Sequence, residues 1–100
     1  MTDESDTEAV LDALFATIED RRDELPEGSY TASLFAHEKG ENATLEKIGE
    51  EATEVILAAK DDDREELLAE SADLVYHLLV LLAMKESSVD DLRAELEDRF

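Results

Sequence analysis

One segment constrains the fold more than any other: residues 74–84, LVYHLLVLLAM, are apolar on almost every side of a helix. They follow the polar break Asp61-Asp62-Asp63, and one of these aspartates is expected to cap a helix of about Arg64 to Lys85. A helix that is apolar all round must be buried all round. The few other helices in a chain of 100 residues can hardly surround it. We therefore expect part of its surface to meet a second copy of the chain.

The N-terminal part is predicted to form one long amphipathic helix. Residues 1–5 are polar and expected to be frayed, and Asp6 or Thr7 can cap the helix that follows. The helix is expected to end near Glu24 or Leu25, because a proline and then a glycine come next. Its apolar residues recur with the spacing of one helical face. These residues are Val10, Leu11, Leu14, Phe15 and Ile18.

The rest of the chain is also predicted to be helical. A short helix is expected around Leu34, and Asn42 or Thr44 begins a second long helix. A serine at 87–88 caps the last helix. No stretch alternates like a strand. The predicted fold is all-α and bundle-like, with four main helices in one domain of residues 1–100, completed by dimerisation.

The charge balance excludes several kinds of partner. Asp and Glu total 29 against nine Lys and Arg, for a formal net charge of −20. Nucleic acids and anionic membranes are bound through basic patches, so neither is an expected partner. An acidic excess of this size resembles the composition of cytosolic proteins from salt-loving organisms, in which salt screens self-repulsion. Most of these acidic side chains are therefore expected to serve solvation.

Nothing in the sequence points away from the cytoplasm. The chain has no cysteine, which excludes disulfides and cysteine-ligated zinc. Its N-terminus lacks the basic and apolar regions of a signal peptide. The longest apolar run, residues 78–84, is far shorter than a membrane span. We predict a soluble cytoplasmic protein.

Two pairs of carboxylates have a spacing that can build a site. Glu51 and Glu54 are three residues apart, as are Glu70 and Asp73, and Glu50 lies beside the first pair. Residues three apart share a helical face, and a short turn between two helices would bring the pairs together. Converging carboxylates repel unless a cation lies between them, and Mg²⁺ prefers oxygen ligands. The pattern predicts a Mg²⁺ site in which Mn²⁺ can substitute; a solvating acidic surface is the alternative.

Other polar residues carry weaker signals. Lys47 and Lys60 flank the acidic helix and are candidate phosphate contacts, although Lys60 also suits the C-terminal end of its helix. His77 continues the stripe of Glu70 and Asp73 at helical spacing, and a hydrogen-bonded core histidine is the commoner role for such a residue. Iron is not expected, because di-iron bundles use Glu-x-x-His motifs and this chain has Glu70-x-x-Asp73.

The blocks around these residues resemble a known family. EExxE, then 15 residues, then ExxD resembles the metal-binding pattern of the all-α nucleoside triphosphate pyrophosphohydrolases, the MazG-like superfamily. Three longer blocks, PEGSYTASLF, LEKIGEEATEVILAAKDDDREEL and ESADLVYHLLVLLA, look like the phosphoribosyl-ATP pyrophosphatase family. The similarity covers approximately residues 8–98.

The resemblance implies hydrolysis of phosphoribosyl-ATP to phosphoribosyl-AMP and pyrophosphate, the second step of histidine biosynthesis. It also implies Mg²⁺ dependence and a homodimer or larger homo-oligomer. By motif position, the implied metal ligands are Glu51, Glu54, Glu70 and Asp73. The implied catalytic residues are Glu50 and Glu51, and the implied substrate-binding residues are Tyr30, Thr31, Lys47 and Lys60.

The chain also departs from the family's pattern. Ala43, Glu46 and Ser33 stand where relatives often carry basic residues. If those residues help to hold the triphosphate, this chain must rely more on the metal and its remaining lysines. Two alternatives stay open: a house-cleaning pyrophosphohydrolase of non-standard nucleoside triphosphates, and a non-catalytic helical dimer that serves as an interaction module.

Overall fold

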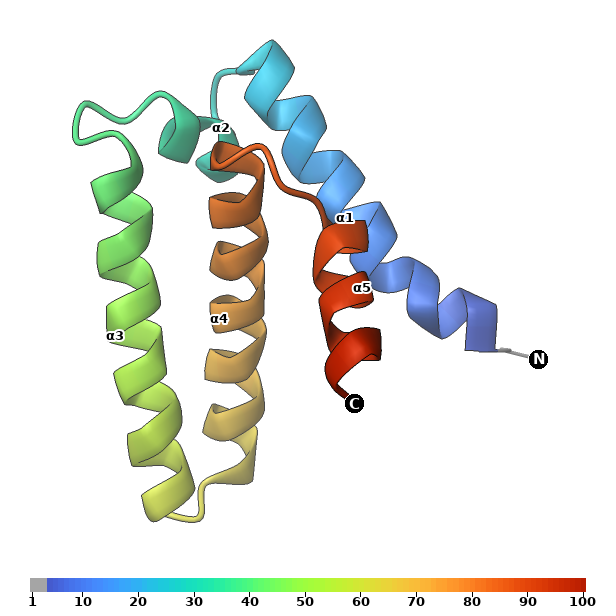
Figure 1. Ribbon diagram of the computed structural model, residues 1–100. Helices are drawn as coiled ribbons and strands as arrows, with labels where there is room; N and C mark the ends of the chain where they lie inside the picture. The colour runs from blue at the N-terminus through green and yellow to red at the C-terminus, as the bar shows by residue number, and fades with distance from the viewer. Residues whose placement is uncertain (1–3) are drawn as a thin grey trace.

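The computed structural model describes residues 4–100, which form helices joined by short turns. α3 and α4 run antiparallel, side by side, and α1 packs against α4, α2 and α5 (Figure 1). This arrangement confirms the predicted all-α class with four main helices; α2 is the short additional one. The helices are α1 (Glu4–Glu24), α2 (Tyr30–Phe35), α3 (Glu41–Lys60), α4 (Arg64–Met84) and α5 (Val89–Arg99).

Side-chain caps fix the starts of three helices. Asp63 accepts a hydrogen bond of 3.1 Å from a backbone N–H in the first turn of α4. Ser88 and Asp91 form a reciprocal capping box at the start of α5, and Ser29 caps α2. Each cap satisfies an N–H group that the helix leaves unpaired. The expected aspartate cap of α4 and serine cap of α5 are confirmed.

The start of α1 differs from the prediction. The helix begins at Glu4, so a cap at Asp6 or Thr7 was wrong. Residues 1–3 of the segment expected to be frayed lie outside the described residues. The end of α1 at Glu24 confirms the prediction.

The start of α3 also lies earlier than expected. The helix begins at Glu41 rather than at Asn42 or Thr44, because Gly40 occupies the cap position. The backbone of Gly40 has φ 63° and ψ −143°, a conformation that residues with a Cβ rarely adopt. The spacing of apolar residues carries no information about such a backbone cap.

The core lies where α1, α2, α4 and the start of α5 meet. Phe15 and Ile18 of the predicted α1 face are buried there, whereas Val10 and Leu11 at the other end of that face remain exposed. α1 therefore covers α4 with its C-terminal half. The buried core residues are Phe15, Ile18, Leu34, Leu79, Val80, Ala83 and Val89.

The interior of the α3–α4 hairpin is partly polar. On α3, the residues that face inward are spaced alternately four and three residues apart, from Thr44 to Ala58. Helices that pack in bundles show this spacing. Two of these inward-facing residues, Thr44 and Glu51, are polar and nonetheless buried. The helix phase thus turns Glu51 toward α4 and leaves Leu45 and Ile56 exposed on its flank. The inward-facing set is Thr44, Ile48, Glu51, Val55 and Ala58.

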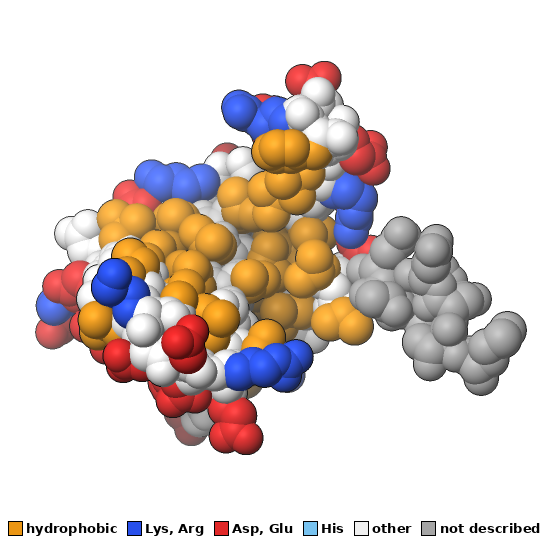
Figure 2. Space-filling model, turned by 90° about the horizontal axis from the view of Figure 1, so that it is seen from below, with side chains coloured by type: hydrophobic (Ala, Val, Ile, Leu, Met, Phe, Trp, Pro, Cys, Tyr) orange, Lys and Arg blue, Asp and Glu red, His pale blue; other side chains and the backbone are white. Residues whose placement is uncertain are grey.

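The described surface carries many large apolar side chains. Figure 2 shows hydrophobic side chains gathered over one face of the molecule. Val75 and Leu78 of α4 are about 40% exposed, as expected for a helix that is apolar all round in so small a chain. The other exposed ones on α3 and α4 are Leu45, Ile56, Leu57 and Leu68.

By length and composition alone, α4 is apolar enough to cross a membrane, the one such helix in residues 4–100. The apolar character of α4 extends beyond the run at 78–84 that bounded the sequence-based expectation. The core helix of a soluble protein passes the same test, and α4 supplies Leu79, Val80 and Ala83 to the core. This helix therefore does not indicate a membrane protein.

Candidate active site

The α3–α4 hairpin brings the two predicted carboxylate pairs opposite each other. Asp62 lies at the centre of the connecting turn, with φ 55°. Glu54 and Glu70 are each eight residues from it (62 − 54 and 70 − 62), and Glu51 and Asp73 are each eleven (62 − 51 and 73 − 62). Residues equally far from the turn of an antiparallel hairpin lie across from each other. The short turn and the helical phase together therefore assemble the acidic cluster.

The charges around Glu70 reflect this convergence. Hydrogen bonding with Glu66 is the main cause that raises the pKa of Glu70 above its ordinary value, followed by desolvation. Repulsion from Glu66, Asp73 and Glu54 raises it further, since a nearby like charge disfavours the ionised form. Glu54 belongs to α3 and the others to α4, so carboxylates of both helices act on one group.

The donor chemistry of this cluster suits a hard divalent cation. Among residues 4–100, no Lys or Arg forms an ion pair with Glu54, Glu70 or Asp73. All the candidate donors are carboxylate oxygens, which Mg²⁺ prefers. As the side chains are oriented, no three His, Asp or Glu of the described part converge closely enough to hold one ion. A coordination shell therefore requires side-chain rotation.

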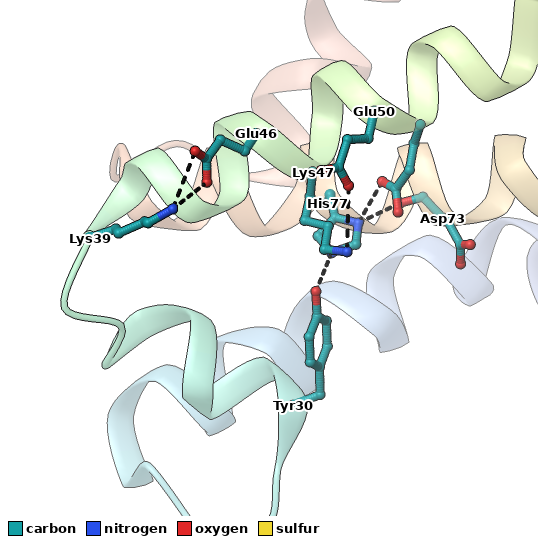
Figure 3. A network of polar contacts seen from close by, with 8 residues as sticks. Tyr30, Lys39, Glu46, Lys47, Glu50, Asp73 and His77 are labelled. Carbon is teal, nitrogen blue, oxygen red and sulfur yellow. Dashed lines mark hydrogen bonds and ion pairs between the residues drawn. The ribbon is translucent and has the colours of Figure 1, made fainter.

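Glu51 is held by a second set of contacts that joins three helices. Its Oε1 lies 2.7 Å from Nδ1 of His77, and Nε2 of His77 lies 3.0 Å from the hydroxyl of Tyr30 (Figure 3). Glu51 and His77 are both buried, whereas Tyr30 is half exposed. The carboxylate of Asp73 turns away from His77 in the same view. Residues from α2, α4 and α3 thus form one chain of hydrogen bonds.

The partners of His77 assign its tautomer. Nδ1 faces two acceptors, the carboxylate of Glu51 at 2.7 Å and the backbone carbonyl of Asp73 at 3.0 Å. Nδ1 must therefore carry the hydrogen. In the neutral imidazole, Nε2 is then an acceptor, and the hydroxyl of Tyr30 donates to it. Burial raises the pKa of this hydroxyl, and the carboxylates of Glu51 and Asp73 raise it further against the opposing charge of Lys47, so Tyr30 stays a donor at neutral pH.

A cavity of about 240 Å³ lies beside this chain, between α2 and the start of α3. Two of the four lysines of the chain line it, Lys39 and Lys47. Lys39 pairs with Glu46 at 3.2 Å and Lys47 with Glu50 at 3.6 Å (Figure 3), so the cavity is close to neutral within a strongly acidic chain. Its lining residues are Tyr30, Ser33, Leu34, His37, Lys39, Ala43, Glu46, Lys47 and Glu50.

The predicted substrate-binding residues do not all reach this cavity. Tyr30 and Lys47 line it, together with the predicted catalytic residue Glu50. Thr31 instead directs its hydroxyl to that of Tyr76. Lys60 lies at the far end of α3, about 20 Å from Lys47 along the helix axis at a rise of 1.5 Å per residue. The structure therefore separates Lys60 from the cavity.

Comparison with known proteins identifies the family. The model of the phosphoribosyl-ATP pyrophosphohydrolase family matches residues 11–100. The chain belongs to this family. A protein of Haloarcula marismortui named phosphoribosyl-ATP pyrophosphatase is 74% identical over 94% of this chain and 96% of its own length. A protein of the same name from Haloquadratum walsbyi is 66% identical over 99% of this chain and 99% of its own length. Another from Clostridium botulinum is 53% identical over 90% of this chain and 80% of its own length.

The departures from the family pattern cluster in space. The cavity beside Tyr30 is lined by all three positions at which the family pattern led us to expect basic residues. These positions hold Ser33, Ala43 and Glu46. Lys39 lies there as well and was not among the predicted site residues. Its only signal was the scarcity of lysine in the chain.

The hydrogen-bonding role of His77 was only partly visible in the sequence. His77 continues the stripe of Glu70 and Asp73, which places it on the α4 face that carries the acidic cluster. The contact with Tyr30 spans 47 residues of sequence. No local pattern could have predicted it.

Proposed function

We propose that this protein hydrolyses phosphoribosyl-ATP to phosphoribosyl-AMP and pyrophosphate in the cytoplasm, as the second step of histidine biosynthesis. Family membership supports the substrate. The observation that carries the proposal is the set of carboxylates that α3 and α4 place opposite one another with no Lys or Arg partner among the described residues, beside a cavity lined by Lys39 and Lys47. One end of the site suits a cation and the other end suits phosphate oxygens.

Glu51, Glu54, Glu70 and Asp73 are the residues that would hold Mg²⁺, with Mn²⁺ as a substitute. A bound Mg²⁺ neutralises phosphate charge and favours ionisation of water. Lys39 and Lys47 bind phosphate oxygens in the cavity, and the ring of Tyr30 forms part of its wall. Because each lysine already lies beside a glutamate, the protein cannot attract a polyanion by its own charge. The substrate therefore binds together with its metal.

In the proposed reaction, a water oxygen forms a bond to the α phosphorus, and the bond from that phosphorus to the oxygen bridging to the β phosphate breaks. Glu50 lies at the edge of the cavity and is exposed, so its carboxylate can orient this water and accept its proton. The bond electrons leave with the β phosphate as pyrophosphate. The Glu50–Lys47 ion pair of 3.6 Å holds the base and the phosphate-binding cation next to each other.

The assignment is tested by pyrophosphate release from phosphoribosyl-ATP in high salt, with and without Mg²⁺. Asp73→Asn and Glu51→Gln should each abolish the reaction while the helical circular dichroism persists. Glu97→Gln removes the same charge from α5, which contributes no residue to the cluster, and serves as the control. Near-wild-type turnover in Asp73→Asn would contradict the site. Faster turnover of dUTP or dCTP would instead assign the chain to house-cleaning hydrolysis.

Metal binding can be measured without substrate. A ligand that binds only the folded state at one hundred times its Kd stabilises it by about 2.7 kcal/mol. At constant ionic strength, Mg²⁺ should therefore raise the melting temperature with a saturable dependence, and Asp73→Asn should weaken that dependence. A melting temperature independent of Mg²⁺ favours the non-catalytic alternative.

We also propose that the protein is a homodimer or a larger homo-oligomer. Val75, Leu78 and Ile56 expose about 40–60% of their surface, and Figure 2 shows a broad hydrophobic face. Exposed apolar patches of this kind are typical of subunit interfaces. A second copy would cover the sides of α4 that the other helices leave open.

A further inference from the structure

Tyr30, His77 and Glu51 come from three helices and form one hydrogen-bonded chain that leads from the cavity to the acidic cluster. At its inner end, His77 engages only one oxygen of Glu51. No described group donates to Oε2, and the only buried polar side-chain atom without a partner in the described residues is Oγ1 of Thr44. Oε2 of Glu51 therefore has no hydrogen-bond partner among the described residues and keeps some exposure, although the side chain as a whole is buried.

A glutamate side chain has several rotatable bonds, so a metal-binding glutamate needs something to hold it. Carboxylates and histidines around metal sites are oriented by hydrogen bonds from a surrounding layer of residues. The N–H of His77 does this for Oε1, and the buried position of the ring leaves it little freedom to move. The hydroxyl of Tyr30 fixes the ring in turn through its hydrogen bond with Nε2.

We propose that His77 and Tyr30 are positioning residues that hold Oε1 of Glu51 so that Oε2 faces the divalent cation. This inference rests on the proposed function. It revises the role of Tyr30, whose hydroxyl is engaged by His77 rather than by substrate, while its ring still lines the cavity. It also gives the histidine a function beyond filling the core.

Substitutions of His77 can separate its two nitrogens. The amide nitrogen of Asn is one bond from Cγ, like Nδ1, and that of Gln is two bonds away, like Nε2. His77→Asn therefore keeps a donor to Glu51 and loses the contact with Tyr30. His77→Gln loses the donor to Glu51 and keeps a hydrogen bond with Tyr30, whose hydroxyl then accepts from the amide N–H. The primary readout is the Mg²⁺ affinity of the protein without substrate, measured by titration calorimetry at constant ionic strength.

We expect His77→Gln to lower the Mg²⁺ affinity about 10–100-fold, the usual effect of removing an orienting partner. His77→Asn should lower it only a few-fold. Tyr30→Phe should lower the Mg²⁺ affinity as much as His77→Asn does. The double variant Tyr30→Phe/His77→Asn should lower it no further, because both changes remove the same hydrogen bond. Tyr76→Phe removes a neighbouring hydroxyl that bonds Thr31 rather than His77 and should leave the Mg²⁺ affinity unchanged. Melting without Mg²⁺ verifies that each variant is folded.

Kinetics add a second readout. If the hydroxyl of Tyr30 positions Glu51, Tyr30→Phe raises the Mg²⁺ concentration needed for half-maximal rate and leaves the KM for phosphoribosyl-ATP at saturating Mg²⁺ unchanged. A raised KM with unchanged Mg²⁺ affinity would overturn the proposal, as would equal losses in His77→Asn and His77→Gln. Wild-type protein that binds Mg²⁺ without releasing pyrophosphate refutes the proposed function alone. Wild-type protein that binds no Mg²⁺ refutes both.

Discussion

Thr44 offers a quantitative test of the packing between α3 and α4. Its side chain is completely buried, and its Oγ1 has no hydrogen-bond partner among the described residues. A buried hydroxyl without a partner costs about 1–3 kcal/mol in proteins. Valine has the same branched shape and nearly the same helix propensity. Thr44→Val should therefore raise the free energy of unfolding by about 1–2 kcal/mol.

The assay is chemical denaturation at fixed salt and protein concentration, followed by far-UV circular dichroism. A gain of 1 kcal/mol corresponds to a rise in melting temperature of about 4–8 °C for a domain of this size. Thr53→Val is the matched control, because Thr53 lies on the same helix, is exposed, and donates to the carbonyl of Gly49 at 3.0 Å. It should change stability by less than about 0.5 kcal/mol.

The opposite sign for Thr44→Val would refute this reasoning. A loss of about 0.5–1.5 kcal/mol is expected if the hydroxyl makes a hydrogen bond in solution, for example to the carbonyl four residues earlier, as Thr17 does at 3.1 Å. Retained pyrophosphate release in the variant would verify that the substitution leaves the active site intact.

Two further predictions concern the core and the assembly. Val80 is fully buried, so Val80→Ala, which removes two methyl groups, should destabilise the protein by about 2–3 kcal/mol including the cavity it leaves; a loss below 1 kcal/mol in the same denaturation assay would contradict the burial. Val75→Glu should shift the sedimentation coefficient from oligomer to monomer, whereas Phe100→Ser, at a nearly fully exposed C-terminal residue, should not; an unchanged oligomer in Val75→Glu would place the interface elsewhere.

Most of the helix pattern could be predicted from the sequence because its signals are local. Asp63 and Ser88 cap helices through their own side chains and nearby backbone, and Leu25 and Pro26 end α1 within a few residues. The start of α3 was missed because Gly40 acts through its backbone conformation. Which apolar residues of α3 are buried was harder to predict. Leu45 and Ile56 fit an apolar helical face as well as the inward-facing residues do, but they remain exposed.

The acidic cluster was predictable for the same reason, since the spacing of Glu51, Glu54, Glu70 and Asp73 needs only two helices and a short turn. The cavity was not, because it depends on how α2 packs against α3, which no local pattern encodes. Lys39 and Tyr30 are nine residues apart and line the same cavity. The position of Lys60 was ambiguous in the sequence, and the length of α3 separates it from this group.

The hydrogen-bonded side chains of Glu51 and His77 occupy buried positions that apolar side chains could fill. Replacing a buried polar pair by hydrophobic residues is often neutral or stabilising, whereas removing one partner leaves the other unsatisfied. His77→Leu alone should therefore destabilise the protein by about 1–3 kcal/mol, the cost of an unpaired buried group. The double variant Glu51→Met/His77→Leu should recover at least the wild-type free energy of unfolding and release no pyrophosphate. If the double variant were less stable than either single variant, the pair would be needed for folding, and its place in the interior could not be attributed to catalysis.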